Sequence, residues 1–241
     1  MGASVIVLGA GASKGVGGAL VRRFAKEGLH VIATGRTFDK VNALAEAAKN
    51  AGGSAEALAI DVTSEADQDA LFEHAAGLGP VAAVLYNAGN NAIIPFEKLE
   101  AKTVEEFWRV GCFGAFLTAK RAVPILKAQG TGSLFFTGAS GSLRGKSNFA
   151  HFAMMKGGLR MLSQSLAREF GPAGIHVAHV IIDGVINGDM VSSRFQEFLD
   201  QLGDEGSLDP NAIADAFWYL HQQPKSAWTQ ELDLRPHSEN W

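Results

Sequence analysis

Short apolar runs alternate with amphipathic segments along almost the whole of this 241-residue chain. The runs are rich in β-branched residues and are bounded by Gly, Asp or Asn, which predicts strands over 4–8, 30–34, 55–60, 81–86, 133–137 and 176–182. The segments between them carry apolar residues at helical spacing. Because crossover helices join parallel strands and the runs are apolar throughout, we expect helices on both faces of the sheet. The predicted fold is α/β, a Rossmann-like doubly wound sheet of about seven parallel strands, the last near 231–234.

The length and the 47% hydrophobic content favour a single domain over 1–241. Two longer helical stretches, about 104–127 and 149–170, flank the fifth predicted strand. The segment 188–209 breaks the alternation, and its apolar residues Met190, Phe195 and Phe198 follow an amphipathic pattern. We therefore predict a lid-like insertion there, placed to cap a site.

Charge and cysteine content exclude several classes of function. The net charge of −4 is spread without long like-charge blocks, which argues against a nucleic-acid or polybasic membrane surface. The single cysteine, Cys112, rules out an intrachain disulfide and a cysteine-clustered zinc site, and we predict no metal site. No targeting pattern or membrane-length apolar run is present. We expect a cytoplasmic protein that acts on a small molecule.

A glycine-rich turn follows the first predicted strand and precedes a helical segment. It contains Gly11, Ser13, Lys14, Gly15, Val16 and Gly17. A tight strand-to-helix turn needs positive φ, and a pyrophosphate needs close backbone approach and the free N–H groups of a helix start. Glycine turns also serve purely structural roles, but this position in a β-α-β unit predicts phosphate binding.

Two basic residues at this end of the sheet bear on the choice of cofactor. Lys14 lies within the glycine turn, and Arg36 follows the second predicted strand, where an NAD-binding site would usually carry a carboxylate. The alternative is that both are ordinary solvated surface charges. Asp39 is the nearest acidic residue and falls beyond the turn. We therefore favour NADP(H) over NAD(H), with the two cations on the 2′-phosphate.

The order of motifs resembles the classical short-chain dehydrogenase/reductases over essentially the whole chain. Gly11-x-x-x-Gly15-x-Gly17 is followed by Asp61-Val62 and then by Asn87-Ala88-Gly89, each after a predicted strand. The resemblance implies that Asp61 and Val62 meet the adenine, that Asn87, Ala88 and Gly89 line the ribose, and that the backbone at Ile186 faces the nicotinamide. Ala10, Asp183 and Gly188 replace the family's usual Thr, Pro and Thr.

The same resemblance exposes departures in the catalytic set. The family uses a Tyr four residues before a Lys on one helix, which allows the ammonium to lower the phenol pKa, together with a Ser and an Asn. Lys156 is retained, and the resemblance gives it a ribose contact. Phe152 takes the Tyr position, Ala139 the Ser position and Gly111 the Asn position. The chain is thus an atypical member that lacks three of the four groups.

Substitutes for the missing groups are few. Tyr86 and Tyr219 are the only tyrosines, and neither is expected on the Lys156 face. Ser140 follows the Ser position by one residue, and it serves equally well as a turn or capping serine. His151 is expected to point away from the Phe152 face, toward solvent or an interface. Asn148 shares that face only if the helix reaches back to it, and an amide can only orient a substrate.

Two functions remain open from the sequence. One is an NADP-dependent oxidoreductase with a non-standard site, in which Lys156 and Ser140 are the catalytic candidates and Ala139, Phe152 and Met190 line the substrate pocket. The other is a non-catalytic NADP(H)-binding or regulatory protein of the same fold. The resemblance further implies a homodimer or homotetramer paired through the two long helices. We interpret Cys112, Phe113 and Phe116 as core residues of the long helix over about 104–127.

Overall fold

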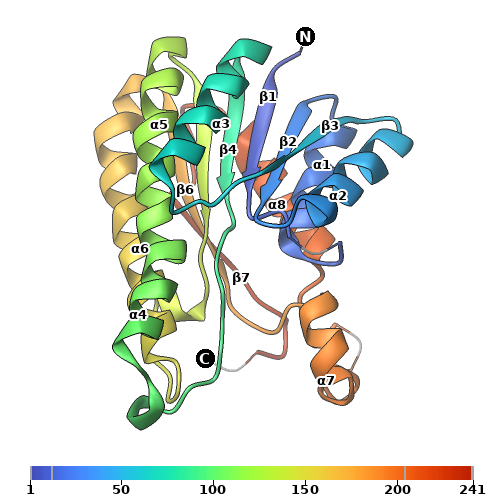
Figure 1. The fold of residues 1–241 in the computed structure, drawn as a ribbon, viewed down its shortest axis with the longest axis vertical. Helices are drawn as coiled ribbons and strands as arrows, with labels where there is room; N and C mark the ends of the chain where they lie inside the picture. Colours follow the sequence, from blue (N-terminus) through green and yellow to red (C-terminus); the bar gives the residue numbers. More distant parts are fainter. Residues whose placement is uncertain (1, 12, 204, 240–241) are drawn as a thin grey trace.

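The computed structural model describes residues 2–11, 13–203 and 205–239. Its parallel strands form one sheet of seven in the order β3-β2-β1-β4-β5-β6-β7 (Figure 1). The strands are β1 (Ser4–Leu8), β2 (His30–Gly35), β3 (Ser54–Ala59), β4 (Val81–Tyr86), β5 (Gly132–Thr137), β6 (Ile175–Ile182) and β7 (Glu231–Leu234). Each predicted strand is present, with its ends within one residue of the expected position, and the predicted α/β fold is confirmed.

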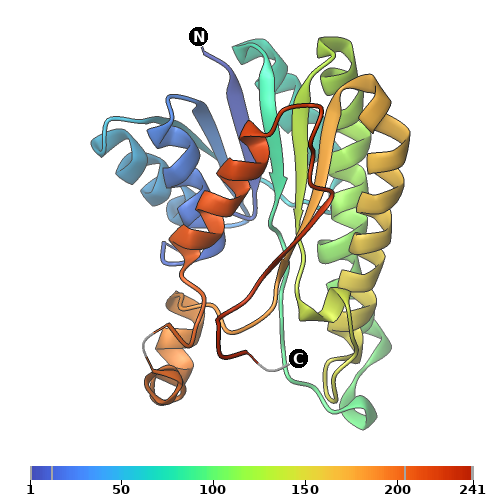
Figure 2. The same ribbon diagram turned by 180° about the vertical axis from the view of Figure 1, so that it is seen from behind.

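Helices cover both faces of the sheet, as the apolar strands required. One face carries α1 (Val16–Lys26), α2 (Phe38–Asn50) and α8 (Pro210–Gln222), and the other carries α3 (Glu65–Leu78), α5 (Gly114–Gln129) and α6 (Ala150–Phe170) (Figure 2). Strand alternation divides the core between them. In β1, Val5 and Val7 join the first cluster while Ile6 and Leu8 join the second.

The strand order reverses between β1 and β4, which lie side by side although two β-α units separate them in sequence. The chain leaves β1 and β4 toward helices on opposite faces of the sheet, so their connecting loops part just beyond the carboxyl ends. Such a switch point is where open α/β sheets bind their ligands. The loops that carry the predicted nucleotide residues after β1 and β4 therefore lie at this switch point.

The long helical stretch expected over 104–127 is built from three pieces. α4 (Ala101–Trp108) continues through a π-helical turn, η2 (Arg109–Phe113), into α5. The Tyr86 hydroxyl from β4 donates a hydrogen bond to the carbonyl of Val110 within that turn. A carbonyl inside the π-helical turn is thus hydrogen-bonded by a side chain from a distant strand. Local periodicity could not predict this interruption of the helix. The interpretation of Phe116 as a core residue is wrong, because 44% of its surface is exposed.

The segment after β6 forms α7 (Asp189–Leu202), with non-helical backbone at Phe195, before α8 begins at Pro210. α7 lies beyond the carboxyl edge of the sheet, as does the start of α4 on the other side (Figure 1). Three short 3₁₀ turns complete the elements, η1 (Phe96–Lys98), η3 (Ser140–Ser142) and η4 (Gly171–Ala173). Within the described residues no helix combines the length and apolarity needed to cross a membrane.

Candidate functional site

The glycine turn after β1 has the geometry that its residues predict. Gly9 and Gly11 adopt positive φ of 85° and 59°. A Cβ built at Gly17 would overlap the carbonyl oxygens of Gly9 and Ala10, so the start of α1 approaches β1 as closely as its backbone allows. The first turn of α1 carries no acidic residue, and no side chain of the described residues caps its N-terminus. Its free N–H groups can therefore receive an anion.

The two predicted cofactor cations lie on neighbouring loops. Lys14 and Arg36 are both exposed, as is Ser13. A Cβ built at Gly35 would lie 4.0 Å from the backbone nitrogen of Gly11, which places the end of β2 against the glycine turn. The fold thus brings the two basic positions to one edge, with no acidic residue between Gly35 and Phe38.

The β4 loop closes against the same turn. Asn87 donates from Nδ2 to the Gly9 carbonyl over 2.9 Å, and Ala88 packs directly on Gly9. Gly89 extends the contact to α6, because a Cβ built there would lie 3.5 Å from Lys156 Nζ. Three segments predicted separately to meet one cofactor therefore converge.

Asp61 and Val62 occupy the turn after β3. The Asp61 carboxylate accepts hydrogen bonds from the backbone and hydroxyl of Thr63, and its own N–H donates to Asp67 over 2.7 Å. Val62 is buried against Gly114 of α5. Asp61 is thus held by its own turn at the exposed edge, one strand away from Arg36.

Lys156 is the buried cation of the site. Only 6% of its surface is exposed, and Nζ donates to the Thr137 carbonyl over 2.7 Å. Burial lowers the pKa of this amine from 10.5 to about 8. Nζ lies 6.0 Å from the centre of the Phe152 ring. An amine that is costly to bury is therefore kept between the β5 end and the β4 loop, facing Gly89.

Of the three replaced positions, Phe152 lies nearest the amine, with Lys156 Nζ 6.0 Å from its ring centre. Phe152 is half-buried, with its ring against Gly141. The N–H of Ala139 donates to Ser142 Oγ over 3.2 Å. Any side chain at Gly111 would overlap Met155, which is fully buried. The space of the family's Asn is thus filled by a neighbour of the lysine.

Neither tyrosine supplies the missing phenol. The Tyr86 hydroxyl is committed to Val110, and burial raises its pKa well above the usual range. Tyr219 lies on α8, on the opposite face of the sheet, and 63% of its surface is exposed. Within the described residues, no tyrosine therefore stands beside Lys156.

One expectation for the substitutes is wrong, and the condition set for another is not met. His151 turns away from Phe152, but it is fully buried and packs edge-on against Phe107 of α4 at 4.5 Å between ring centres, so it is not solvated. Asn148 lies outside the helix, in left-handed backbone with φ of 68°, because α6 begins only at Ala150. It therefore does not share the Phe152 face through helical spacing. Ser140 is the first residue of the η3 turn, and its carbonyl accepts hydrogen bonds from the N–H groups of Leu143 and Arg144.

The Asp at the family's Pro position is a buried carboxylate, and the sequence interpretation missed the ion pair that it forms. Asp183 is 1% exposed and accepts two hydrogen bonds from Arg144, at 2.8 and 2.9 Å, while Arg235 lies 3.2 Å away. The pair joins the loop after β5 to the end of β6. A carboxylate directly after a strand rich in Val and Ile was the available signal, since such a residue needs a charged partner when buried.

The start of α7 is tied to the glycine turn. Asp189 donates from its N–H to the Lys14 carbonyl over 2.7 Å, and Lys14 donates from its N–H to the Asp189 carboxylate over 2.9 Å. Gly188 has no room for a side chain against Lys14. Nearby, Ile186 bridges to Leu208, and Met190 is exposed. An acidic side chain at the start of α7 therefore occupies an N–H group of the predicted phosphate site.

The comparisons with known proteins agree with this architecture. The profile of the family described as short chain dehydrogenase matches residues 5–198. The oxidoreductase YuxG of Bacillus subtilis, described as uncharacterized, is 33% identical over 77% of this chain, which spans only 28% of that protein. The 3beta-hydroxysteroid dehydrogenase 1 of Eggerthella lenta is 32% identical over 81% of this chain and 75% of its own length.

A solved structure extends the likeness to the whole fold. The short-chain dehydrogenase from Rhodopseudomonas palustris superposes with a TM-score of 0.84 at 36% identity, and the match covers 98% of this chain and 99% of that one. The matched profile covers the glycine turn, the β4 loop and Lys156 alike. This chain therefore belongs to the short-chain dehydrogenase/reductases, a family of oxidoreductases that bind a nicotinamide cofactor and act on small molecules.

Proposed function

We propose that this protein binds NADP(H) and transfers hydride to or from a small, activated acceptor without a phenolic acid. The observation that carries the proposal is the retention of Lys156, buried between Gly89 and the Thr137 carbonyl, beside an apolar ring at position 152. A buried amine has a solvation cost, so its retention without the tyrosine it usually serves favours a role in holding the cofactor.

The cofactor site fits a nicotinamide dinucleotide on several independent features. The residues proposed to hold it are Gly11, Ser13, Lys14, Gly15, Val16, Gly17, Arg36, Asp61, Val62, Asn87, Ala88, Gly89, Lys156 and Ile186. The glycine cradle would be filled by any Cβ at Gly17, and α1 presents an uncapped N-terminus. Lys14 and Arg36 favour the 2′-phosphate of NADP(H). When bound, the nicotinamide would supply the hydride.

The proton is the part of the reaction that this site supports least. General acid catalysis commonly contributes about 10²–10⁴-fold, and Phe152 cannot donate a proton. Ser140 can hydrogen-bond an acceptor, but its hydroxyl is too weak an acid to replace a phenol next to an ammonium. The proposed substrate is therefore an acceptor that is already polarised or conjugated, held by Ala139, Phe152 and Met190.

The test measures cofactor binding and turnover separately. We expect NADPH to bind more tightly than NADH, by titration calorimetry, and Arg36→Asp to remove most of the difference, about tenfold or more. We expect NADPH oxidation with an activated diketone such as phenanthrenequinone and little with a simple ketone. Equal affinity for the two cofactors in the wild-type protein would contradict the NADP(H) assignment.

A second candidate is a non-catalytic NADP(H)-binding or regulatory protein. It is favoured by one observation, the replacement of Tyr, Ser and Asn by Phe152, Ala139 and Gly111 in a site whose cofactor residues still converge. Tight NADPH binding with no oxidation by any of a panel of quinones, imines and conjugated ketones would favour this candidate and exclude the first.

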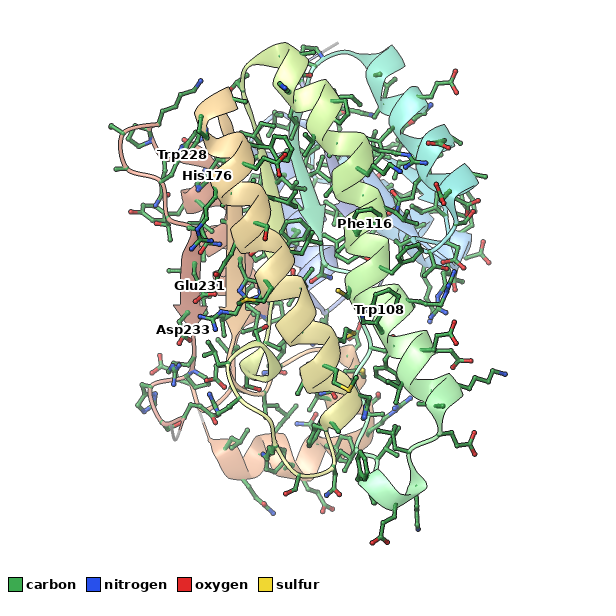
Figure 3. The ribbon with its side chains drawn as sticks, turned by 90° about the vertical axis from the view of Figure 1, so that its left-hand side faces the viewer. Trp108, Phe116, His176, Trp228, Glu231 and Asp233 are labelled. Atoms are coloured by element: carbon green, nitrogen blue, oxygen red, sulfur yellow. The ribbon has the colours of Figure 1, made fainter. Side chains whose placement is uncertain are left out.

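We also propose that the protein forms a homodimer or homotetramer through α4, α5 and α6. Trp108, Phe113 and Phe116 stack in a row, with 5.6 and 6.1 Å between ring centres. Trp108 and Phe116 lie on the outer face that Figure 3 presents. Met154 and Met161 are exposed on the neighbouring α6. Several exposed apolar side chains on neighbouring helices are typical of an interface. Light scattering should find an oligomer that Phe116→Glu dissociates, whereas Tyr219→Glu on α8 should leave it intact.

A further inference from the structure

A chain of hydrogen bonds, buried at its inner end, leads to the turn that contains position 139. It begins at Arg160 of α6, which donates from Nε and from the second guanidinium nitrogen to the two oxygens of Glu231 on β7, both at 2.7 Å. His179 Nδ1 lies 3.2 Å from Glu231 Oε2, and His179 Nε2 lies 3.2 Å from Ser142 Oγ. His179 is fully buried, while Glu231 lies at the β7 edge of the sheet (Figure 3).

Donor and acceptor capacities determine the direction of every bond in this chain. Arg160 has no acceptor, so it holds Glu231 as an ionised carboxylate and lowers its pKa. Burial lowers the pKa of His179 to about 4, so the ring is neutral at neutral pH. Facing a carboxylate, its Nδ1 must carry the hydrogen. Nε2 is then an acceptor, and the Ser142 hydroxyl must donate to it.

The last bond reaches the candidate active site. The Ser142 hydroxyl donates its hydrogen bond to His179 Nε2, so the Ser142 oxygen remains available as an acceptor. The Ala139 N–H donates to that oxygen over 3.2 Å. The imidazole also packs directly against the turn, since a Cβ at Gly138 would overlap the Nε2 and Cε1 atoms of His179. Gly138 in turn donates to the Val180 carbonyl over 2.7 Å. The turn 138–142 thus rests on the ring and is bonded to it.

We propose that His179 is a positioning residue of this site, which through Ser142 orients the turn 138–142 and leaves the Ser140 hydroxyl as the group that meets the substrate. The inference rests on the proposed function, because it assigns the turn to substrate binding. Ser142 cannot replace the family's serine, since its hydrogen is committed to His179. In the described part of the chain, the Ser140 hydroxyl makes no such commitment.

The direction of the chain is tested without any substrate. Histidine side-chain NMR of the wild-type protein should show His179 as the neutral tautomer protonated at Nδ1, and the backbone amide of Ala139 should exchange slowly with solvent. A charged ring, or a ring protonated at Nε2, at neutral pH would overturn the assignment whether or not the protein binds NADPH.

The positioning role is tested with matched variants on one strand. His179→Phe keeps an aromatic ring without polar atoms, and His179→Gln keeps one donor and one acceptor. The control is His176→Phe, which removes the other buried histidine of β6, stacked on Trp228 away from the turn (Figure 3). We expect His179→Phe to speed Ala139 amide exchange and lower kcat with phenanthrenequinone about tenfold, with NADPH affinity unchanged.

Recovery separates positioning from general destabilisation. His179→Gln should restore both the slow Ala139 exchange and most of kcat, and His176→Phe should leave both at wild-type values. Unchanged Ala139 exchange in His179→Phe would overturn the proposal, as would an equal loss of kcat in the His176→Phe control. If the wild-type protein binds NADPH but does not turn over, the proposed reaction fails, while the tautomer and the amide exchange still decide the role of His179.

Discussion

Met155 on α6 fills the space that a side chain at Gly111 would need, in the middle of the π-helical turn. Gly111→Asn should therefore lower the free energy of unfolding by about 1–3 kcal/mol, because inserted atoms overpack a filled core. Urea unfolding measures the change. In the double variant Gly111→Asn/Met155→Ala, the asparagine should fill the cavity that the smaller alanine leaves. The double variant should therefore lose less unfolding free energy than the sum of the losses in the two single variants.

Gly77→Asn is the control for this pair, because Gly77 lies within α3 with open space around it. It should leave stability nearly unchanged, since asparagine and glycine differ little in helix propensity. Strictly additive losses at Gly111 and Met155 would show that the two positions are not coupled.

The Phe152 ring stands where a phenol would meet Lys156 Nζ, 6.0 Å from the ring centre. Phe152→Tyr with Ala139→Ser should restore an acid and a carbonyl ligand. We expect NADPH-dependent reduction of a simple ketone to rise by about 10²-fold, because the ammonium lowers the phenol pKa. Steady-state assays of ketone reduction measure this gain, and NADPH affinity, measured in parallel, is the control. No gain at unchanged NADPH affinity would show that the pocket itself has been remodelled.

Lys156 makes the stability of the protein depend on alkaline pH. Burial lowers its pKa in the folded protein from 10.5 to about 8, so between these values the unfolded chain binds more protons. The free energy of unfolding should rise with pH across that window, by at most about 3 kcal/mol. Lys156→Met should lose this rise in urea unfolding measured at successive pH values, and it should weaken NADPH binding about tenfold.

The matched control for this lysine is Lys127→Met, which removes an exposed lysine near the end of α5. It should keep the wild-type slope of stability against pH and the wild-type affinity for NADPH. If Lys156→Met retained the slope, the titrating group would lie elsewhere in the protein.

The carboxylate of Asp189 holds the Lys14 N–H at the predicted phosphate site. A phosphate must approach this negative charge or displace it, so Asp189→Asn should tighten NADPH binding about threefold to tenfold. Titration calorimetry measures the change, which should shrink as salt increases. Asp200→Asn changes the same helix at its far end, where the carboxylate accepts from Gln196, and should leave the affinity alone. An unchanged affinity in Asp189→Asn would mean that this contact does not oppose the cofactor.

The fold and the outline of the cofactor site could be predicted because they depend on local patterns. Alternating apolar runs placed all seven strands, and the glycine turn after the first strand marked the place where α1 begins. Parallel strands end at a common edge, so Asn87 and Gly89, which follow β4, had to lie near that turn. These features follow from the order of residues along the chain.

Other features depend on which side chains meet from distant parts of the sequence, and only the tertiary structure decided them. The depth of packing between α4 and α6 buries His151, and the backbone before α6 removes Asn148 from the helix. The filling of Gly111 by Met155 requires the π-helical turn to face α6.

The same holds for the polar contacts that define this site. His179 reaches Ser142 across 37 residues, and Asp189 reaches Lys14 across 175. No local periodicity encodes such distances, because each contact follows from the relative placement of two elements and from the need of buried polar groups for partners. The sequence by itself determined a dinucleotide-binding sheet with its lysine and without its tyrosine, while the packed structure decided what replaced the missing groups.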